Sequence, residues 1–88
     1  MVLDKRGGTA VSDQAAEIVV YMQPHCASCG EVERFLRERG VPFTVIDISE
    51  DPDALEEIIS RGYMTTPVTR IGKHWIAGFN RKHLERLL

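Results

Sequence analysis

The chain has 88 residues, which is enough for one domain and no more. Its net charge of −2 provides no excess of positive charge, the usual basis for binding nucleic acid or an anionic membrane surface. No apolar run approaches the roughly 18–20 residues that a membrane-spanning helix needs. We therefore expect a small folded domain that acts on neither nucleic acids nor membranes.

Residues 1–16 contain no apolar segment of the kind found in a secretory signal. Their small, polar and glycine-containing composition predicts a mobile extension, and the folded domain is expected over residues 17–88. The two cysteines, Cys26 and Cys29, are too close together to restrict the unfolded chain as a structural disulfide would. This cysteine usage favours a reducing, cytoplasmic location.

The first predicted element is a strand, because Ile18 to Met22 is a short apolar and β-branched run that ends before Pro24. A helix is predicted from Cys29 to Arg39, with a buried face made by Val32, Phe35 and Leu36. The β-rich run from Phe43 to Ile48 predicts a second strand. A strand, a helix and a strand in this order predict a parallel, right-handed unit.

A second helix is predicted after Asp51, which can cap it, and Pro52, which suits its first turn. Its expected buried residues are Leu55, Ile58 and Ile59, and it should end at Gly62. The ranges Val68 to Ile71 and His74 to Ala77 then predict a β-hairpin around Gly72-Lys73.

The last predicted element is a third helix, capped by Asn80 and buried through Leu84, Leu87 and Leu88. The predicted order is therefore β-α-β-α-β-β-α. Such an order indicates an α/β domain with a four-stranded mixed sheet and helices on both faces.

The two cysteines lie where the first predicted strand is followed by the start of a helix. The unpaired N–H groups and the dipole of a helix N-terminus stabilise an anion, and a thiolate is such an anion. We therefore expect Cys26 to be the attacking thiolate. Cys29 lies one turn further along the helix on the same side, from where it resolves a mixed disulfide. A Cys-x-x-Cys pair in this setting favours thiol–disulfide exchange.

A metal or iron–sulfur site is the main alternative, because His25 adjoins Cys26. Zinc sites need about four ligands, usually from two clusters, whereas His74 and His83 are far from the cysteine pair along the chain. A cluster shared between two chains stays open. His25 has two interpretations: a solvated loop residue, or a cation that stabilises the Cys26 thiolate.

Several short motifs match a known family. They are Pro24-His25-Cys26-Ala27-Ser28-Cys29, Asp47-Ile48-Ser49, Gly62-Tyr63, Thr66-Pro67-Val68, His74-Trp75 and Gly78-Phe79. With these motifs, residues 18–88 resemble the glutaredoxins of the thioredoxin superfamily and are most similar to the NrdH-redoxins, which supply electrons to ribonucleotide reductase. The resemblance implies a thioredoxin-like fold and a monomeric dithiol oxidoreductase. It also implies that this enzyme needs no cofactor or metal and reduces protein disulfides, including that of ribonucleotide reductase.

The resemblance also implies which other residues lie near the cysteines. The Thr66-Pro67 bond is expected to be cis, although X-Pro bonds in general are cis only about 5–6% of the time. A cis bond there leaves the backbone of Thr66 to pair with an extended substrate. The remaining expected substrate-binding residues are Gln23, His25, Gly78, Phe79, Asn80 and Arg81.

Differences from typical glutaredoxins bear on the electron source. Glutaredoxins often have a basic residue where this chain has Gln23, and Gly-Gly-x-Asp where it has Ala77-Gly78-Phe79-Asn80. The missing basic group removes a contact to a glutathione carboxylate. An enzyme resembling thioredoxin reductase is therefore favoured as the electron source, with glutathione as the alternative.

Residues of the last predicted helix and hairpin carry further expectations. Arg81 and Lys82 fall in the first turn of a helix, where positive charge costs about 0.3–1 kcal/mol against the dipole. That position fits an anionic ligand or acidic partner as well as it fits a tolerated exposed charge. Trp75 is expected to pack in the fold, whereas Phe79 is expected either in the core or at the rim of a docking surface.

Three functions therefore follow from the sequence, and the first is favoured. The chain is a dithiol electron carrier, or it binds and delivers an iron–sulfur cluster, using Cys26 and glutathione in a dimer. The third hypothesis is an adaptor without redox activity, against which the intact cysteine pair argues.

Overall fold

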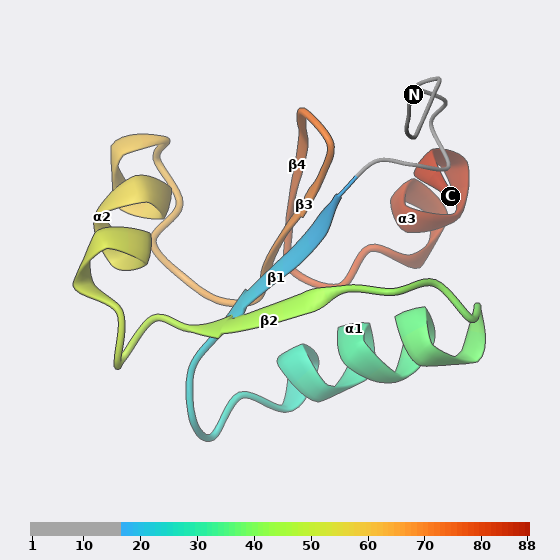
Figure 1. Cartoon of the computed structure of the whole chain (residues 1–88), viewed down its shortest axis with the longest axis horizontal. Coiled ribbons are helices and arrows are strands. Elements are labelled where there is room, and N and C mark those ends of the chain that lie inside the picture. The colour runs from blue at the N-terminus through green and yellow to red at the C-terminus, as the bar shows by residue number, and fades with distance from the viewer. Residues whose placement is uncertain (1–16) are drawn as a thin grey trace, which may run out of the picture.

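The computed structural model describes residues 17–88 of the chain (Figure 1). Its elements are β1 (Ile18–Met22), α1 (Ala27–Glu38), β2 (Thr44–Asp47), α2 (Pro52–Ser60), β3 (Val68–Ile71), β4 (His74–Ala77) and α3 (Arg81–Leu87). The strands form one sheet in the order β2-β1-β3-β4. β1 is parallel to β2, whereas the β1–β3 and β3–β4 pairs are antiparallel. The α/β fold with a mixed four-stranded sheet is confirmed.

The extension predicted over residues 1–16 lies outside the described residues. Within residues 17–88, no helix has both the length and the apolar character that crossing a membrane requires. The elements of the predicted domain are all present in this part of the chain.

The first helix begins earlier than predicted. α1 starts at Ala27 rather than Cys29, because the sulfur of Cys26 already accepts a hydrogen bond from the first turn and caps the helix. The helix ends at Glu38, one residue before the predicted Arg39, which is its C-cap. A cysteine is not one of the usual capping residues, so the composition of the segment did not reveal this start.

The second strand is shorter than predicted. β2 covers Thr44–Asp47, whereas the β-rich run extends from Phe43 to Ile48. The N–H of Ile48 still donates a hydrogen bond of 2.9 Å to the carbonyl oxygen of Met22, which continues the contact between β1 and the chain after β2.

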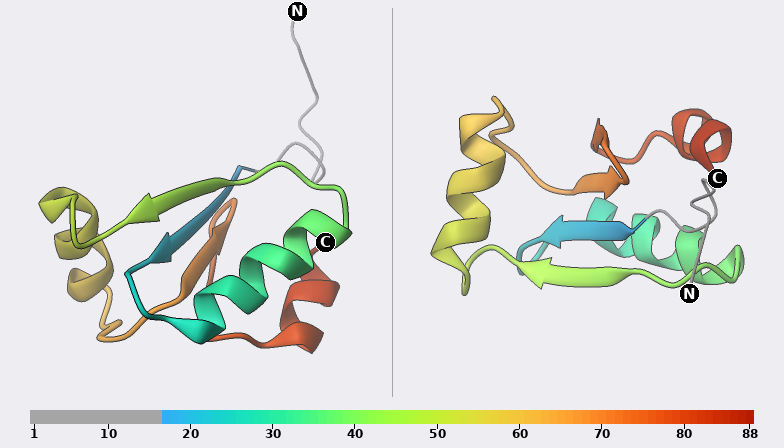
Figure 2. Two further views of the ribbon diagram at one scale, coloured as in Figure 1. Left: turned by 90° about the horizontal axis from the view of Figure 1, so that it is seen from below. Right: turned by 45° about the horizontal axis from the view of Figure 1, so that its top comes forward.

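The central strand β1 is buried on both faces, and its successive side chains point to opposite sides of the sheet. Ile18 and Val20 belong to a core shared with α1 and α3, whereas Val19 and Tyr21 belong to a core shared with α2. Figure 2 shows α1 and α3 close together and α2 apart from them, near the end of the sheet to which β1 and β2 point. The first core contains Ile18, Val20, Val32, Phe35, Leu36, Ile71, Ile76 and Leu84, and the second contains Val19, Tyr21, Ile48, Ala54, Ile58 and Val68.

The predicted buried face of α2 is partly wrong. Ile58 is buried as expected, but Leu55 is 37% exposed and Ile59 is 45% exposed. Ala54 takes the second buried position, at 7% exposure. The helix therefore packs through a face centred on Ala54 and Ile58. Leu55 and Ile59, each one residue further along and about 100° further around the axis, are turned toward solvent.

The predicted buried face of α3 is also too long. Leu84 is fully buried and Leu87 is half-buried against the first core. Leu88 follows the last helical residue and is 40% exposed, so it does not complete the stripe.

The contrast between two helical leucines gives a direct test of this packing. Leu36→Ala empties a site in the first core and is expected to lower the free energy of unfolding by about 2–5 kcal/mol. Leu55→Ala removes a side chain that is partly in solvent and should cost well under half as much. Urea denaturation of both variants measures the difference, and equal losses would contradict the packing of α2.

Candidate active site

Cys26 occupies the N-terminal cap of α1. The chain leaves β1 at Met22, turns through Pro24 and His25, and enters the helix after Cys26. His25 has a φ of 64°, in the left-handed region that few non-glycine residues adopt. Cys26 is extended, with φ −113° and ψ 101°, and its Sγ accepts a hydrogen bond of 3.2 Å from the backbone N–H of Cys29. The sulfur thus takes the place that a serine or aspartate oxygen fills in an ordinary cap.

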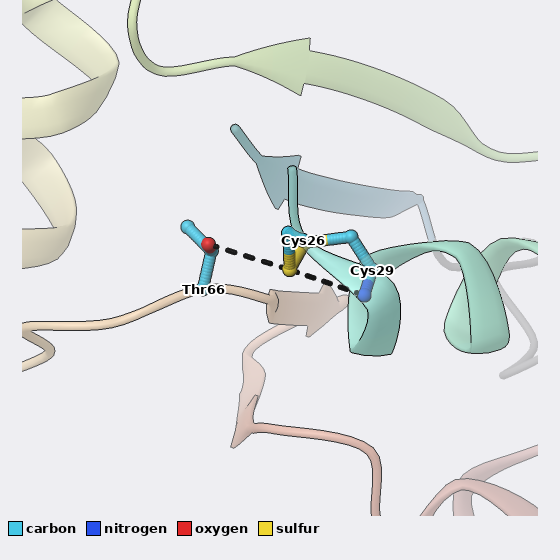
Figure 3. Close-up of a disulfide and its surroundings, with 3 residues drawn as sticks. All are labelled: Cys26, Cys29 and Thr66. Carbon is cyan, nitrogen blue, oxygen red and sulfur yellow. Dashed lines mark hydrogen bonds between the residues drawn. A yellow bond between two sulfur atoms is a disulfide. The ribbon is translucent and has the colours of Figure 1, made fainter. Parts of the chain in front are cut away.

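The structure contains a disulfide between Cys26 and Cys29, whose Cα atoms are 5.3 Å apart (Figure 3). The two residues differ in exposure: Cys26 is half-buried, whereas Cys29 is only 1% exposed. An incoming molecule therefore meets Cys26 before Cys29.

Thr66 lies across from the disulfide on the chain that leads into β3 (Figure 3). Its Oγ1 donates a hydrogen bond to Cys26 Sγ over 3.6 Å, which is within the range for sulfur acceptors. The bond between Thr66 and Pro67 is cis, as the resemblance to glutaredoxins implies. Within residues 17–88, the backbone N–H and C=O of Thr66 make no hydrogen bond to another backbone group. The main chain beside the sulfur therefore has a donor and an acceptor to offer.

Gly78 is held next to this loop by its own backbone. Its N–H donates a hydrogen bond of 2.8 Å to the carbonyl oxygen of Pro67. Gly78 has a φ of 72°, a conformation that a side chain makes costly. The main chain of Gly78 therefore lies beside Pro67, while the substrate-binding role expected for Gly78 stays a prediction.

The two residues after Gly78 contact α1 and α3, and Arg81 begins α3. The ring of Phe79 meets that of Phe35 edge-on, with centroids 6.1 Å apart, and Phe79 is still 36% exposed. Asn80 caps α3 by accepting a 3.0 Å hydrogen bond from the N–H of His83. Arg81 lies over the ring of Phe35 at 5.5 Å and forms an ion pair with Glu85. No contact joins Asn80 or Arg81 to the cysteines among the described residues, so their binding roles stay predictions.

Gln23 lines a groove that the sequence did not predict. The groove has a volume of about 110 Å³ and runs from Gln23 and Thr66 along α2. Its apolar lining includes Leu55 and Ile59, the two residues wrongly assigned to the core from their helical spacing. α2 thus has more apolar residues than its buried face requires, and this was the sequence signal that could have indicated the groove.

An aromatic cluster packs against the chain segment that leads from α2 to Thr66. Trp75 stacks on Tyr21 and Tyr63, with centroids 5.8 and 6.1 Å away, and the guanidinium of Arg61 lies 4.3 Å from the Trp75 ring centre. The packing role predicted for Trp75 is confirmed. Burial is the main reason that the pKa of Tyr21 is raised above its ordinary value, against the opposing effect of Arg70. The neutral phenol donates a hydrogen bond to Glu57, which fastens α2 to β1.

The described residues offer no ready metal site. Nowhere in residues 17–88 do three or more His, Cys, Asp or Glu side chains gather closely enough to hold a metal ion. A cluster shared between two chains and glutathione stays an untested prediction.

Comparison with known proteins identifies the family. The sequence model of the Glutaredoxin family matches residues 18–76, which carry the cysteine pair, the cis-proline loop and most of the sheet. The chain belongs to the glutaredoxin family. With its disulfide-forming Cys26 and Cys29, it is a glutaredoxin-like thiol–disulfide oxidoreductase with a thioredoxin-like fold.

Individual relatives place the chain near the NrdH branch of the glutaredoxin family. The glutaredoxin-like protein NrdH of Lactococcus lactis subsp. cremoris is 30% identical over 70 residues, covering 80% of this chain and 97% of that protein. The solved structure of NrdH-redoxin from Escherichia coli, a glutaredoxin-like protein with a thioredoxin-like activity profile, matches with a TM-score of 0.78 at 28% identity. That match covers 82% of this chain and 95% of the other. The N-acetyl-S-hydroxy-L-cysteine reductase of Bacillus subtilis is 40% identical over 58 residues, covering 64% of this chain and 61% of that protein.

The hydrogen bond from Thr66 predicts a measurable effect on the reduced protein. Thr66→Val keeps the side-chain shape but removes the hydroxyl donor, so the thiolate at Cys26 loses one stabilising partner. We expect the thiolate absorbance to appear at higher pH, and the reaction with a small disulfide at neutral pH to slow about three- to tenfold. Thr65→Val, one residue away and without this hydrogen bond, is the control. Identical titrations of both variants would contradict the role of the hydroxyl.

Proposed function

We propose that the protein is a dithiol electron carrier in which Cys26 attacks and Cys29 resolves. The Cys26 thiolate attacks one sulfur of a protein disulfide, forming a mixed disulfide and releasing the other sulfur as a thiolate. The Cys29 thiolate then attacks Cys26 Sγ, which releases the second substrate thiol and leaves the Cys26–Cys29 disulfide. Two electrons pass from the dithiol to the substrate, and the released thiolates take up protons.

The observation that carries these roles is the difference between the two sulfurs. Cys26 is partly exposed and its Sγ accepts two hydrogen bonds, from the Cys29 N–H and the Thr66 hydroxyl. Both donors and the N-terminus of α1 favour negative charge on this sulfur. Cys29 is buried one turn into the helix, so it can reach Cys26 but is shielded from a bulky substrate.

The substrate is held as an added strand on the Thr66 backbone. The N–H and C=O of Thr66 have no backbone partner among the described residues, and they stand beside the reactive sulfur. An extended peptide can pair with both groups. Gly78 supports this arrangement because its N–H holds the carbonyl of Pro67, the residue that follows Thr66.

For the reductant, we propose an enzyme resembling thioredoxin reductase, acting on a cytoplasmic monomer. Gln23 is uncharged, and none of the residues that line the groove beside it is a lysine or arginine that would bind a glutathione carboxylate.

The similarity to NrdH-redoxins supports ribonucleotide reductase as the disulfide substrate.

An insulin-reduction assay separates the two electron sources. We expect turnover with NADPH and thioredoxin reductase, and at least tenfold less with NADPH, glutathione and glutathione reductase. Cys26→Ser should abolish the activity in either system. Faster turnover with glutathione would reverse the assignment of the reductant, and no turnover with either source would refute the proposed function.

Trapping the intermediate tests the order of attack. Cys29→Ser leaves the nucleophile but removes the resolving thiol, so a substrate disulfide should remain bound to Cys26 in nearly stoichiometric yield. Non-reducing gels and mass spectrometry measure the adduct. In Cys26→Ser, the buried Cys29 should form at least tenfold less adduct in the same time. Equal trapping by both variants would contradict the assigned roles.

A further inference from the structure

The groove next to the cysteines exposes apolar side chains of α2 and of the chain that follows it. Leu55, Ile59 and Met64 line it and are 37%, 45% and 77% exposed. Ile58 and Tyr63 close its inner side, and Thr66 forms the end that touches Cys26 Sγ. A substrate side chain that lies in this groove is therefore separated from the reactive sulfur by only one residue, Thr66.

Acidic groups are frequent on α2, the helix that forms one wall of this apolar surface. α2 and the turn before it carry five carboxylates: Glu50, Asp51, Asp53, Glu56 and Glu57. Two of them have structural partners, since Asp51 caps α2 and Glu57 accepts from Tyr21. Glu50, Asp53 and Glu56 form no ion pair with another residue of the range 17–88.

The position of Glu56 connects the charge to the groove. Glu56 follows Leu55 directly and precedes Ile59 by three residues, so it neighbours Ile59 on the surface of α2. The one basic residue at the end of this helix, Arg61, lies over Trp75 and within 4.0 Å of Glu57. The outer rim of the groove therefore carries negative charge at Glu56, while its lining is mostly apolar and contains no charged side chain.

We propose that this groove selects protein substrates in which the reactive cysteine is flanked by an apolar residue followed by a lysine or arginine. The apolar side chain lies between Leu55, Ile59 and Met64, and the basic group meets the carboxylate of Glu56. The inference rests on the proposed function, and it names the class of disulfide that the site prefers. A partner with acidic residues at these positions is disfavoured by repulsion.

Short peptides with one activated cysteine measure this preference. Each peptide carries its cysteine as a mixed disulfide with thionitrobenzoate. The Cys26 thiolate attacks the peptide sulfur and expels coloured thionitrobenzoate, and Cys29 then releases the peptide thiol. The peptides place Leu-Lys, Leu-Glu or Ser-Lys next to the cysteine, on its N-terminal side in one set and on its C-terminal side in the other. The mixed disulfide of N-acetylcysteinamide, which has neither a flanking residue nor a free carboxylate on the cysteine, is the reference for reactivity at the sulfur.

Two pairs of variants separate the groove from general effects. Glu56→Lys reverses the charge at the rim, and Glu38→Lys makes the same change on α1, which packs on the other core. Ile59→Thr removes apolar surface from the groove, and Val45→Thr does so at a similarly exposed position on β2. Because both apolar side chains are partly in solvent, neither change empties the core.

For the wild-type protein we expect Leu-Lys to react fastest in at least one of the two sets. Glu56→Lys should slow the Leu-Lys peptide about two- to fivefold and accelerate the Leu-Glu peptide, with both effects shrinking at high salt. Ile59→Thr should slow both leucine peptides and leave Ser-Lys nearly unchanged. Glu38→Lys and Val45→Thr should behave as wild type. Each variant's peptide rates are divided by its own rate with N-acetylcysteinamide thionitrobenzoate, so that only changes in preference are compared.

The outcomes distinguish the two proposals. If all peptides react at one rate, or if Glu38→Lys alters the preference as much as Glu56→Lys, the groove inference is wrong while the exchange chemistry stands. If reduced wild-type protein reacts with none of the disulfides, the proposed function itself fails.

Discussion

The hydrogen bond between the N–H of Cys29 and the sulfur of Cys26 is the contact on which the site depends. It makes a redox-active sulfur the cap of α1, so that the start of the helix and the position of Cys26 Sγ are decided together. A cap oxygen would satisfy the same N–H but could not carry electrons. The same geometry places the second sulfur one turn further along, buried and within reach of the first.

The rest of the fold brings a second chain segment to that sulfur. β1 is buried on both faces, with α1 and α3 against one and α2 against the other. Because β3 is antiparallel to β1, the start of β3 lies beside the end of β1. The loop that enters β3 is therefore close to the start of α1. Thr66 thereby reaches Cys26 from 40 residues away in the sequence. The hydrogen bond from Gly78 to Pro67 and the stacking around Trp75 hold that loop from two sides.

The order of elements was predictable because its signals are local. Apolar runs, Gly72-Lys73 in the hairpin and the caps Asp51 and Asn80 each act over a few residues. The cysteine pair was equally visible, since a short motif carries its chemistry. The contact between Thr66 and Cys26 was expected only through family resemblance, because no periodicity relates residues so far apart.

The groove was not predicted because an apolar residue at helical spacing looks the same whether it faces a core or a partner. Leu55 and Ile59 fit the stripe of a buried helix, and only the packing of Ala54 and Ile58 on the sheet shows that they point elsewhere. The capping role of Cys26 was hidden for a similar reason, since it depends on where the sulfur points. Sequence patterns thus indicated the fold and the reaction, while the surfaces that recognise a substrate emerged from the packing.

We expect the cap position to make Cys26, and not Cys29, the reactive thiol. Reduced protein treated with less than one equivalent of iodoacetamide at neutral pH, followed by mass-spectrometric mapping, tests it most directly. Carbamidomethylation should fall almost entirely on Cys26, and this preference should be lost when the protein is unfolded in urea. Equal labelling of both cysteines in the folded protein, or labelling first at Cys29, would contradict it.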